Sequence, residues 1–188
     1  NPPPQVMNEV LSNPNIESLD ISYTYNAEYD FSALVNLKKL IIGSNNLSEI
    51  PPGVFELTSL EELVLAGNLF TQVPSEIGNL KRLKVLNLGS NKLKGFPSEI
   101  MNCTELQTLI LGGNDSLLEI PNEIGNLRKL EVLKLGRCNL KQLPSSIENC
   151  VNLKTLNAQQ NQINKIDFSF SNLRQLNEVN LSNNGLSE

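Results

Sequence analysis

Leucines recur along most of the chain with a fixed spacing, and the stretch Leu83–Leu93, LKVLNLGSNKL, shows the unit that repeats. Leucine occupies its first, fourth, sixth and eleventh positions, and Asn91 occupies the ninth. Two of the leucines flank Asn87, and this alternation predicts a short strand with one buried face and one open face. A unit of this size cannot bury its own leucines, so it requires a copy on each side.

The unit is repeated in register about eight times between Ile16 and Leu186. From the second unit on, the opening leucines are 23, 23, 23, 24, 23 and 23 residues apart: Leu37, Leu60, Leu83, Leu106, Leu130, Leu153 and Leu176. The ninth position carries Asn45, Asn68, Asn91, Asn114, Cys138, Asn161 and Asn184. An asparagine amide donates and accepts, so it can satisfy backbone groups where each coil turns away from its strand. These positions are predicted to form a buried ladder in which Cys138 is a structural substitute.

A second pattern, apolar-Pro-x-x-Ile-x-x-Leu, lies between the strands, as in Val73-Pro74 with Ile77 and Leu80. Proline is tolerated in the first turn of a helix, and apolar spacing of three favours a short helical or 3-10 segment. Because strands pack more closely than the segments opposite them, the stack should curve with its sheet inside. The predicted fold class is therefore an α/β solenoid, a horseshoe with a concave parallel β-sheet and short helical or 3-10 segments on the convex side.

A short amphipathic segment precedes the repeats. Its apolar residues, from Val6 to Leu11, follow helical spacing and predict a helix over residues 4 to 12. We expect residues 1–15 to form an N-terminal capping helix and residues 16–188 to form the repeat domain. No polar cap follows the last repeat, which predicts that a C-terminal cap is missing from this chain.

Two repeats depart from the pattern. The first has Thr24 in the ladder position and holds all three tyrosines, Tyr23, Tyr25 and Tyr29. A degenerate terminal repeat is typical of a cap, but tyrosine is also favoured in interfaces, so either role fits the cluster. The fifth repeat has one extra residue within Asn114–Leu117. This insertion is either neutral, since loops tolerate added residues, or a functional bulge at the edge of the horseshoe.

Composition limits the chemistry that the chain can perform. Its net charge of −5 argues against nonspecific binding to nucleic acid, and no segment approaches the ~18 consecutive apolar residues of a membrane span. The absence of histidine removes the usual general base and the commonest metal ligand. Carboxylates such as Glu61, Glu62 and Glu178 are scattered along a rigid sheet. We expect no catalytic residues, no metal site and no cofactor.

From about Ile16 to Leu186 the chain resembles the leucine-rich-repeat family, in segments such as LEELVLAGNLF and the return segments PSEIGNLKRL and PNEIGNLRKL. The phrase EIGNL is similar to plant receptor-type repeats, but those have one more residue between the asparagine and the proline. Here Asn91 and Pro97 are 6 residues apart. This spacing resembles the 23-residue intracellular class of Ras-binding scaffold proteins, fungal adenylyl cyclases, junctional scaffold proteins and Roco proteins. The resemblance implies a non-catalytic protein-binding module in a larger intracellular signalling or scaffold protein.

The three cysteines, Cys103, Cys138 and Cys150, are an odd and sparse set without a CxxC pair. Secreted proteins of the family commonly close their ends with disulfides, and neither end here holds a cysteine. Cys103 and Cys150 replace leucines of the return segments two coils apart, which is too far for a disulfide. We therefore expect reduced thiols in a cytoplasmic protein.

Strand residues that alternate with the buried leucines should line the hollow of the horseshoe. Five of them form an apolar band across coils two to six: Ile41, Val64, Val85, Ile110 and Val132. Exposed contiguous apolar surface is typical of an interaction site, although β-branched residues also simply suit strands. The predicted protein-binding residues of this concave face are Lys39, Ile41, Glu62, Val64, Val85, Asn87, Thr108, Ile110, Val132, Lys134 and Asn157.

Small residues follow the strands at Gly43, Ala66, Gly89, Gly112 and Gly136. They could let a partner approach the sheet closely. They could equally serve the turn that follows, because glycine tolerates unusual backbone angles.

Charge around the band alternates by coil: Lys38 and Lys39, Glu61 and Glu62, Lys84, then Glu131 beside Lys134 and Arg137. A mixed rim steers a protein partner and suits a polyanion poorly. We therefore expect a protein partner and no nucleic acid. The resemblance to scaffold proteins makes a small GTPase or a phosphatase a plausible partner; the oligomeric state does not follow from the sequence.

The alternative is an extracellular recognition or adhesion protein, such as a receptor ectodomain or a pathogen surface protein. Four Asn-x-Ser/Thr sequons, at Asn46, Asn102, Asn114 and Asn180, would be candidate glycosylation sites in that setting. Asn114 belongs to the predicted ladder and could not carry a glycan without breaking it. In a repeat so rich in asparagine, such matches also arise by chance.

Overall fold

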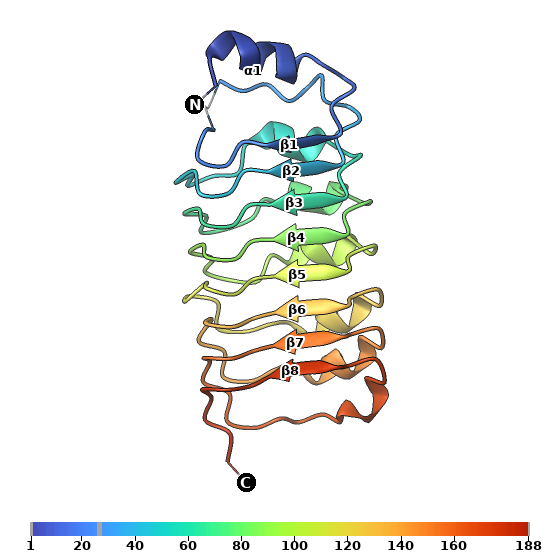
Figure 1. Cartoon of the computed structure of the whole chain (residues 1–188). Helices are drawn as coiled ribbons and strands as arrows, with labels where there is room; N and C mark the ends of the chain where they lie inside the picture. The colour runs from blue at the N-terminus through green and yellow to red at the C-terminus, as the bar shows by residue number, and fades with distance from the viewer. Residues whose placement is uncertain (1, 26–27, 188) are drawn as a thin grey trace.

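Each repeat of the sequence forms one coil of a solenoid, in which the chain runs along a strand, turns, and returns on the opposite side (Figure 1). The computed structural model describes residues 2–25 and 28–187. Residue 1 of the predicted capping helix and residues 26, 27 and 188 of the predicted repeat domain lie outside these ranges. The coils follow one another in chain order, and helix α1 (Pro4–Leu11) lies at one end of the stack.

One parallel sheet of eight strands, ordered β1 to β8, runs the length of the stack. The strands are β1 (Ser18–Asp20), β2 (Lys39–Ile41), β3 (Glu62–Val64), β4 (Val85–Asn87), β5 (Thr108–Ile110), β6 (Val132–Lys134), β7 (Thr155–Asn157) and β8 (Glu178–Asn180). The register pairs each residue with its equivalent in the next repeat, as in Leu63 with Leu86 and Leu86 with Leu109. The solenoid predicted from the leucine spacing is thus confirmed.

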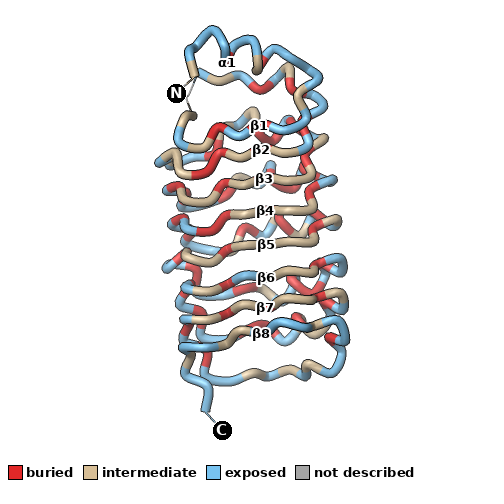
Figure 2. Tube along the Cα trace, viewed as in Figure 1, coloured by how far each residue is buried: buried red, intermediate tan, exposed pale blue. Residues whose placement is uncertain are grey.

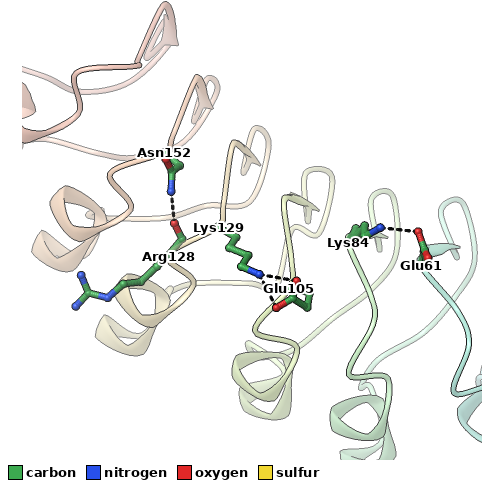
Figure 3. A network of polar contacts seen from close by, with 6 residues as sticks. All are labelled: Glu61, Lys84, Glu105, Arg128, Lys129 and Asn152. Carbon is green, nitrogen blue, oxygen red and sulfur yellow. Dashed lines mark hydrogen bonds and ion pairs between the residues drawn. The ribbon is translucent and has the colours of Figure 1, made fainter.

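Short 3-10 helices form the opposite side of the coils (Figure 3). They are η1 (Pro52–Glu56), η2 (Ser75–Asn79), η3 (Ser98–Asn102), η4 (Asn122–Asn126), η5 (Ser145–Asn149) and η6 (Phe170–Asn172). The proline of the repeat comes directly before most of them. For example, the carbonyl of Pro74 accepts a hydrogen bond from the Ile77 N–H at 3.1 Å. The proline therefore starts the turn, and its missing N–H leaves no intrahelical bond unmade.

The interior of the stack is formed by the leucines of adjoining coils. Leu63, Leu86 and Leu109 have no solvent exposure, and burying each contributes roughly 2 kcal/mol. Buried positions recur in the coils of β1 to β7, whereas the coil of β8 is mostly exposed (Figure 2). Cys103 and Cys150 lie buried at leucine positions after η3 and η5 and are free thiols, as predicted. The core is therefore a column, and each coil completes its neighbour.

The predicted ladder is present, and Asn91 shows how it works. Its Oδ1 accepts from the N–H of Phe70 at 3.1 Å, while its Nδ2 donates to the carbonyls of Leu65 and Leu88 at 3.1 and 3.0 Å. Only 6% of Asn91 is exposed. Asn91 therefore bonds to backbone groups of its own coil and of the coil before it. Adjoining ladder amides share these carbonyls, since Leu65 also accepts from Asn68 and Leu88 also accepts from Asn114.

Cys138 interrupts the ladder in the sixth coil, directly after the coil that holds the extra residue. Its thiol takes over part of the donor role and lies 3.4 Å from the Leu111 carbonyl, but it offers no amide oxygen to coil five. In coil five the Leu117 N–H donates instead to the Asn114 carbonyl of its own coil at 2.9 Å. The extra residue makes this internal bond possible. The insertion and the cysteine are therefore linked: the internal bond of coil five replaces the bond that an asparagine at position 138 would accept.

The residue before each ladder position has a left-handed backbone conformation, with φ between 53° and 77°. These residues are Tyr23, Ser44, Gly67, Ser90, Gly113, Arg137, Gln160 and Asn183. The chain must turn sharply there to carry the ladder residue from the strand into the interior. Glycine adopts this conformation freely, whereas other residues lose about 1 kcal/mol or more.

Helix α1 packs against the first coil through Met7 and Leu11, which are 5% and 6% exposed. Tyr25 and Tyr29 are also part of this end, with their rings edge to face at 5.7 Å and both partly buried against the core. Burial raises the pKa of Tyr25. Tyr23 is instead 77% exposed, so the cluster divides into two packed residues and one surface residue. Within the described ranges, no helix combines the length and apolar character needed to cross a membrane.

Candidate protein-interaction surface

The first and third residues of each strand form one face of the sheet, which we call the sheet face. All eleven residues predicted to bind a partner lie on this face, on β2 to β7; Lys134 is exposed and the other ten are partly exposed. The strands contact only neighbouring strands, and no other described element packs on them. The sheet face is therefore an open surface whose side chains the core does not require.

The apolar band is less continuous than its sequence order suggests. The register places Ile41 beside Val64, but it then places Asn87 between Val64 and Ile110. Val85 and Val132 belong to the other row, on either side of Thr108. The apolar residues therefore form one adjacent pair and a zigzag of separate contacts, and none of them is fully exposed.

Amide side chains in the same row serve the chain itself as well as the surface. The Oδ1 of Asn87 accepts from the Gly89 N–H at 2.9 Å, and the Oδ1 of Asn157 accepts from the Gln159 N–H at 3.1 Å. These local bonds hold the end of the strand in place before the left-handed turn. Asn87 and Asn157 are thus rigid polar groups on the sheet face.

Much of the alternating charge is paired between adjoining coils. Lys39 and Glu62 form an ion pair of 3.0 Å on the sheet face itself. Just before the strands, Lys84 pairs with Glu61 at 2.7 Å, and further around the coils Lys129 pairs with Glu105 at 2.6 Å (Figure 3). The hydrogen bond from Lys84 lowers the pKa of Glu61, and the charge of Lys84 adds to the effect. These ion pairs neutralise part of the charge of the rim within the chain itself.

A shallow depression of about 210 Å³ lies at the C-terminal ends of the central strands. It is lined by Ser90, Ile110, Gly112, Gly113, Lys134, Gly136, Arg137, Asn157 and Gln159. Arg137 and Gln159 were not among the predicted contact residues, because they lie beyond the alternating positions. One signal was available in the sequence: Arg137 stands where neighbouring repeats have Gly113 or Gln160.

The glycines of this depression are required by the stacking of the coils. A Cβ atom added to Gly112 would lie 2.8 Å from the carbonyl oxygen of Gly136, a backbone atom that cannot move aside. At Gly43 the corresponding contact, to the Ala66 carbonyl, would be 3.3 Å. The stacking of the coils therefore accounts for Gly112, and no binding partner is needed to explain it. The base of the depression nevertheless consists of backbone without side chains.

The side chains of the described residues offer little for catalysis or metal binding. They contain no group of three or more cysteine, aspartate or glutamate residues placed to hold a metal ion. Burial raises the pKa of Cys103 and of Cys150 to about 11 and also raises that of Cys138. Since the thiolate is the reactive form, these cysteines are poor nucleophiles near neutral pH.

Comparison with known families and structures gives a consistent result. The family described as "Leucine rich repeat" matches residues 35–93 and 58–115, and the family described as "BspA type Leucine rich repeat region (6 copies)" matches residues 101–188. No curated protein matches the chain.

Several solved structures have the same fold. An internalin (inlF) from Listeria monocytogenes aligns over 93% of the chain with 25% identity and a TM-score of 0.80. An internalin C2 from the same organism aligns over 93% of the chain with 26% identity and a TM-score of 0.81. The plant peptide hormone receptor RGFR1, in complex with RGF2, aligns over 90% of the chain with 29% identity and a TM-score of 0.73. The chain spans 50%, 75% and 32% of these three structures, respectively.

Proposed function

The chain belongs to the leucine-rich-repeat family, and we propose that it is a non-catalytic module that holds a protein partner on the concave sheet face. The observation that carries this proposal is the sheet face itself, an open surface that no other described element covers. Its side chains differ from coil to coil although the coils have the same backbone. A scaffold of identical coils with a varied surface is suited to recognising another protein.

Two features of the sheet face suit a folded protein as the partner. Ile41 and Val64 are neighbours and supply an apolar contact, while Lys39 and Glu62 beside them supply both signs of charge. Interfaces combine such an apolar centre with a polar rim. As the specific partner we propose a small GTPase or a phosphatase, which the spacing of the repeats favours through its resemblance to scaffold proteins.

We place this function in the cytoplasm, within a larger signalling or scaffold protein. The three buried free thiols, Cys103, Cys138 and Cys150, support this assignment, because reduced cysteines persist in the cytosol. The step of six residues from ladder residue to proline, as from Asn91 to Pro97 and from Cys138 to Pro144, also supports it.

A second candidate is an extracellular recognition protein, and the structural relatives favour it. They include two internalins and a plant peptide hormone receptor in complex with RGF2. The two candidates differ in glycosylation. Asn46 and Asn102 are exposed, so an extracellular protein should carry glycans there, whereas Asn114 is fully buried in the ladder. Glycopeptide mass spectrometry of the native protein separates them: glycans at Asn46 or Asn102 would overturn the cytoplasmic assignment.

The sheet face itself can be tested by changing Ile41, Val64 and Ile110 together to glutamate. We expect this variant to lose most of the proteins that the wild-type chain captures from a cell extract, because three like charges would oppose the apolar contact. The matched control changes three apolar residues that are exposed outside the sheet, Val35, Leu118 and Val151, to glutamate. Circular dichroism must show both variants folded. Unchanged capture by the sheet variant, or equal loss in the control, would contradict the proposal.

A further inference from the structure

The depression at the ends of β5 to β7 differs in charge from the rest of the sheet face. Its side chains Ile110, Lys134 and Asn157 are neighbours in the register, so the flanking positions of Lys134 are neutral. Arg137 lies on the same rim, one turn beyond the strand. Two cations therefore stand together over a floor made of glycine backbone.

Neither of these cations forms an ion pair within the described part of the chain, in contrast to lysines elsewhere along the sheet. Lys39 has Glu62, Lys84 has Glu61, and Lys154 has Glu131. The chain has a net charge of −5, so carboxylates are not scarce. Two cations left together, in a hollow, form a local site for an anionic group.

The backbone at Arg137 points in the same direction. Its φ is 61°, a left-handed conformation that costs a residue other than glycine about 1 kcal/mol or more. Arg137 is the one charged residue among the left-handed residues of the described chain, and the equivalent residue of the preceding coil is Gly113. Ser44, Ser90 and Gln160 have the same conformation in other coils, so what distinguishes Arg137 is the charge that this turn places on the rim of the depression.

We propose that this depression recognises an acidic side chain of the partner, an aspartate or glutamate whose carboxylate lies between Lys134 and Arg137. The proposal rests on the protein-binding function assigned above to the sheet face. Arginine and lysine bind carboxylates through charge-assisted hydrogen bonds, and Ile110 offers an apolar contact for the adjoining part of the partner. Gly112 and Gly136 let an extended segment lie close to the sheet.

The surroundings explain why the ligand is one acidic group within a polypeptide. Glu178, on β8 to one side of the depression, would repel an extended polyanion, whereas Glu62 on the other side is already paired with Lys39. The sheet also continues past the depression in both directions, through β4 and β8. A bound segment can therefore pass across the site, which suits an internal side chain better than a chain end.

The test starts with a displayed library of random peptides of about ten residues, amidated in all later measurements. Peptides selected on the purified chain should be enriched in aspartate or glutamate at one position. The affinity of the strongest acidic peptide, measured by fluorescence anisotropy, should fall about tenfold or more in a Lys134→Gln/Arg137→Gln variant. Changing the acidic residue of the peptide to its amide should cause a similar loss.

Controls match the change in charge. A Lys92→Gln/Lys94→Gln variant removes two exposed cations that are absent from the depression, and it should bind the peptide within about twofold of the wild type. An Arg137→Gly variant relieves the left-handed strain, so its midpoint of thermal unfolding should rise while its affinity falls. A purely structural role for Arg137 would lower stability or leave binding unchanged, and either result would overturn the proposal.

The same peptides separate this inference from the proposed function. If they show no acidic preference but lose binding in an Ile41→Glu/Val64→Glu variant, the sheet face binds and the carboxylate site is wrong. If binding is indifferent to both sets of substitutions, the sheet face is not the binding surface and both proposals fail. Preference for a phosphoserine peptide over its glutamate counterpart by tenfold or more would also overturn the carboxylate assignment.

Discussion

Asn87 and Asn91 lie in the same coil, four residues apart, and belong to two rows that run the length of the solenoid. Asn91 is buried and bonds to backbone groups of two coils. Asn87 lies on the sheet face, where its side chain accepts one local bond from the Gly89 N–H. The ladder is almost wholly asparagine, whereas the row of Asn87 contains acidic, apolar, amide and basic residues.

The difference shows where each residue choice comes from. The identity of a ladder residue is determined by its hydrogen bonds to the chain's own backbone. Because the backbone is nearly the same in every coil, this identity hardly changes. A residue on the sheet face is not determined by the backbone of the coil, so its identity varies from coil to coil. Repetition within one sequence therefore separates structural positions from candidate recognition positions, even without related sequences.

The most severe way to test this comparison is to remove the two amides separately. Asn91→Ala leaves the buried N–H of Phe70 without a partner. The carbonyls of Leu65 and Leu88 each keep one donor, from Asn68 and Asn114, so we expect a loss of roughly 2 to 4 kcal/mol in unfolding free energy. Asn87→Ala, the matched control, should change it by about 1 kcal/mol or less, because the site is partly exposed. Urea unfolding followed by circular dichroism measures both. Equal losses would show that the rows do not differ as described.

A smaller effect is expected where the ladder contains Cys138. Deleting Ser116 should destabilise the chain, because the Leu117 N–H loses its bond to the Asn114 carbonyl. Adding Cys138→Asn to that deletion should restore stability, since the new amide oxygen can accept from coil five. Alone, Cys138→Asn should bring no gain. We expect a coupling of about 2 kcal/mol from the four-variant cycle in urea. Additive effects would refute the link between the insertion and the cysteine.

The smallest effect concerns the ion pairs of the rim. Lys84 holds the pKa of Glu61 below the usual carboxyl range, so the pair stabilises the fold above the ordinary carboxyl pKa of about 4.3. That contribution disappears as the pH falls through the lowered pKa. In Lys84→Gln the pKa of Glu61, followed by NMR, should return towards its ordinary value. The unfolding midpoint at pH 7 should scarcely change, since exposed pairs contribute little. A large stability loss would contradict this ranking.

Much of the fold could be predicted from the sequence because the information is local and repeated. Alternation around Leu86 fixed its strand, the equal spacing fixed the register, and the Pro-x-x-Ile pattern located the 3-10 helices. The ladder function of Asn91 followed from the chemistry of an amide at a turn. Such inferences depend on one coil and its neighbour, which the sequence displays directly.

The surface was harder to predict because it depends on pairings between coils. The apolar band appeared continuous in sequence order, but the register interleaves Asn87 between Val64 and Ile110. The alternating charges appeared available, yet Lys39 and Glu62 neutralise each other across two strands. Arg137 was predicted as a rim charge but not as a contact residue, because its left-handed backbone and its place beside Lys134 in the depression depend on the folded coils. These properties arise only when the coils are stacked.

The in-register stacking also governs how the chain reaches its structure. Paired strand residues are separated by 21 to 24 residues at every step, as in Leu19 with Leu40, Leu63 with Leu86 and Leu109 with Leu133. Each step therefore closes a loop of nearly the same length, with nearly the same loss of chain entropy. Folding can nucleate at any adjoining pair of coils and propagate outward. A longer array of the same coils would repeat this step and require no new kind of long-range contact.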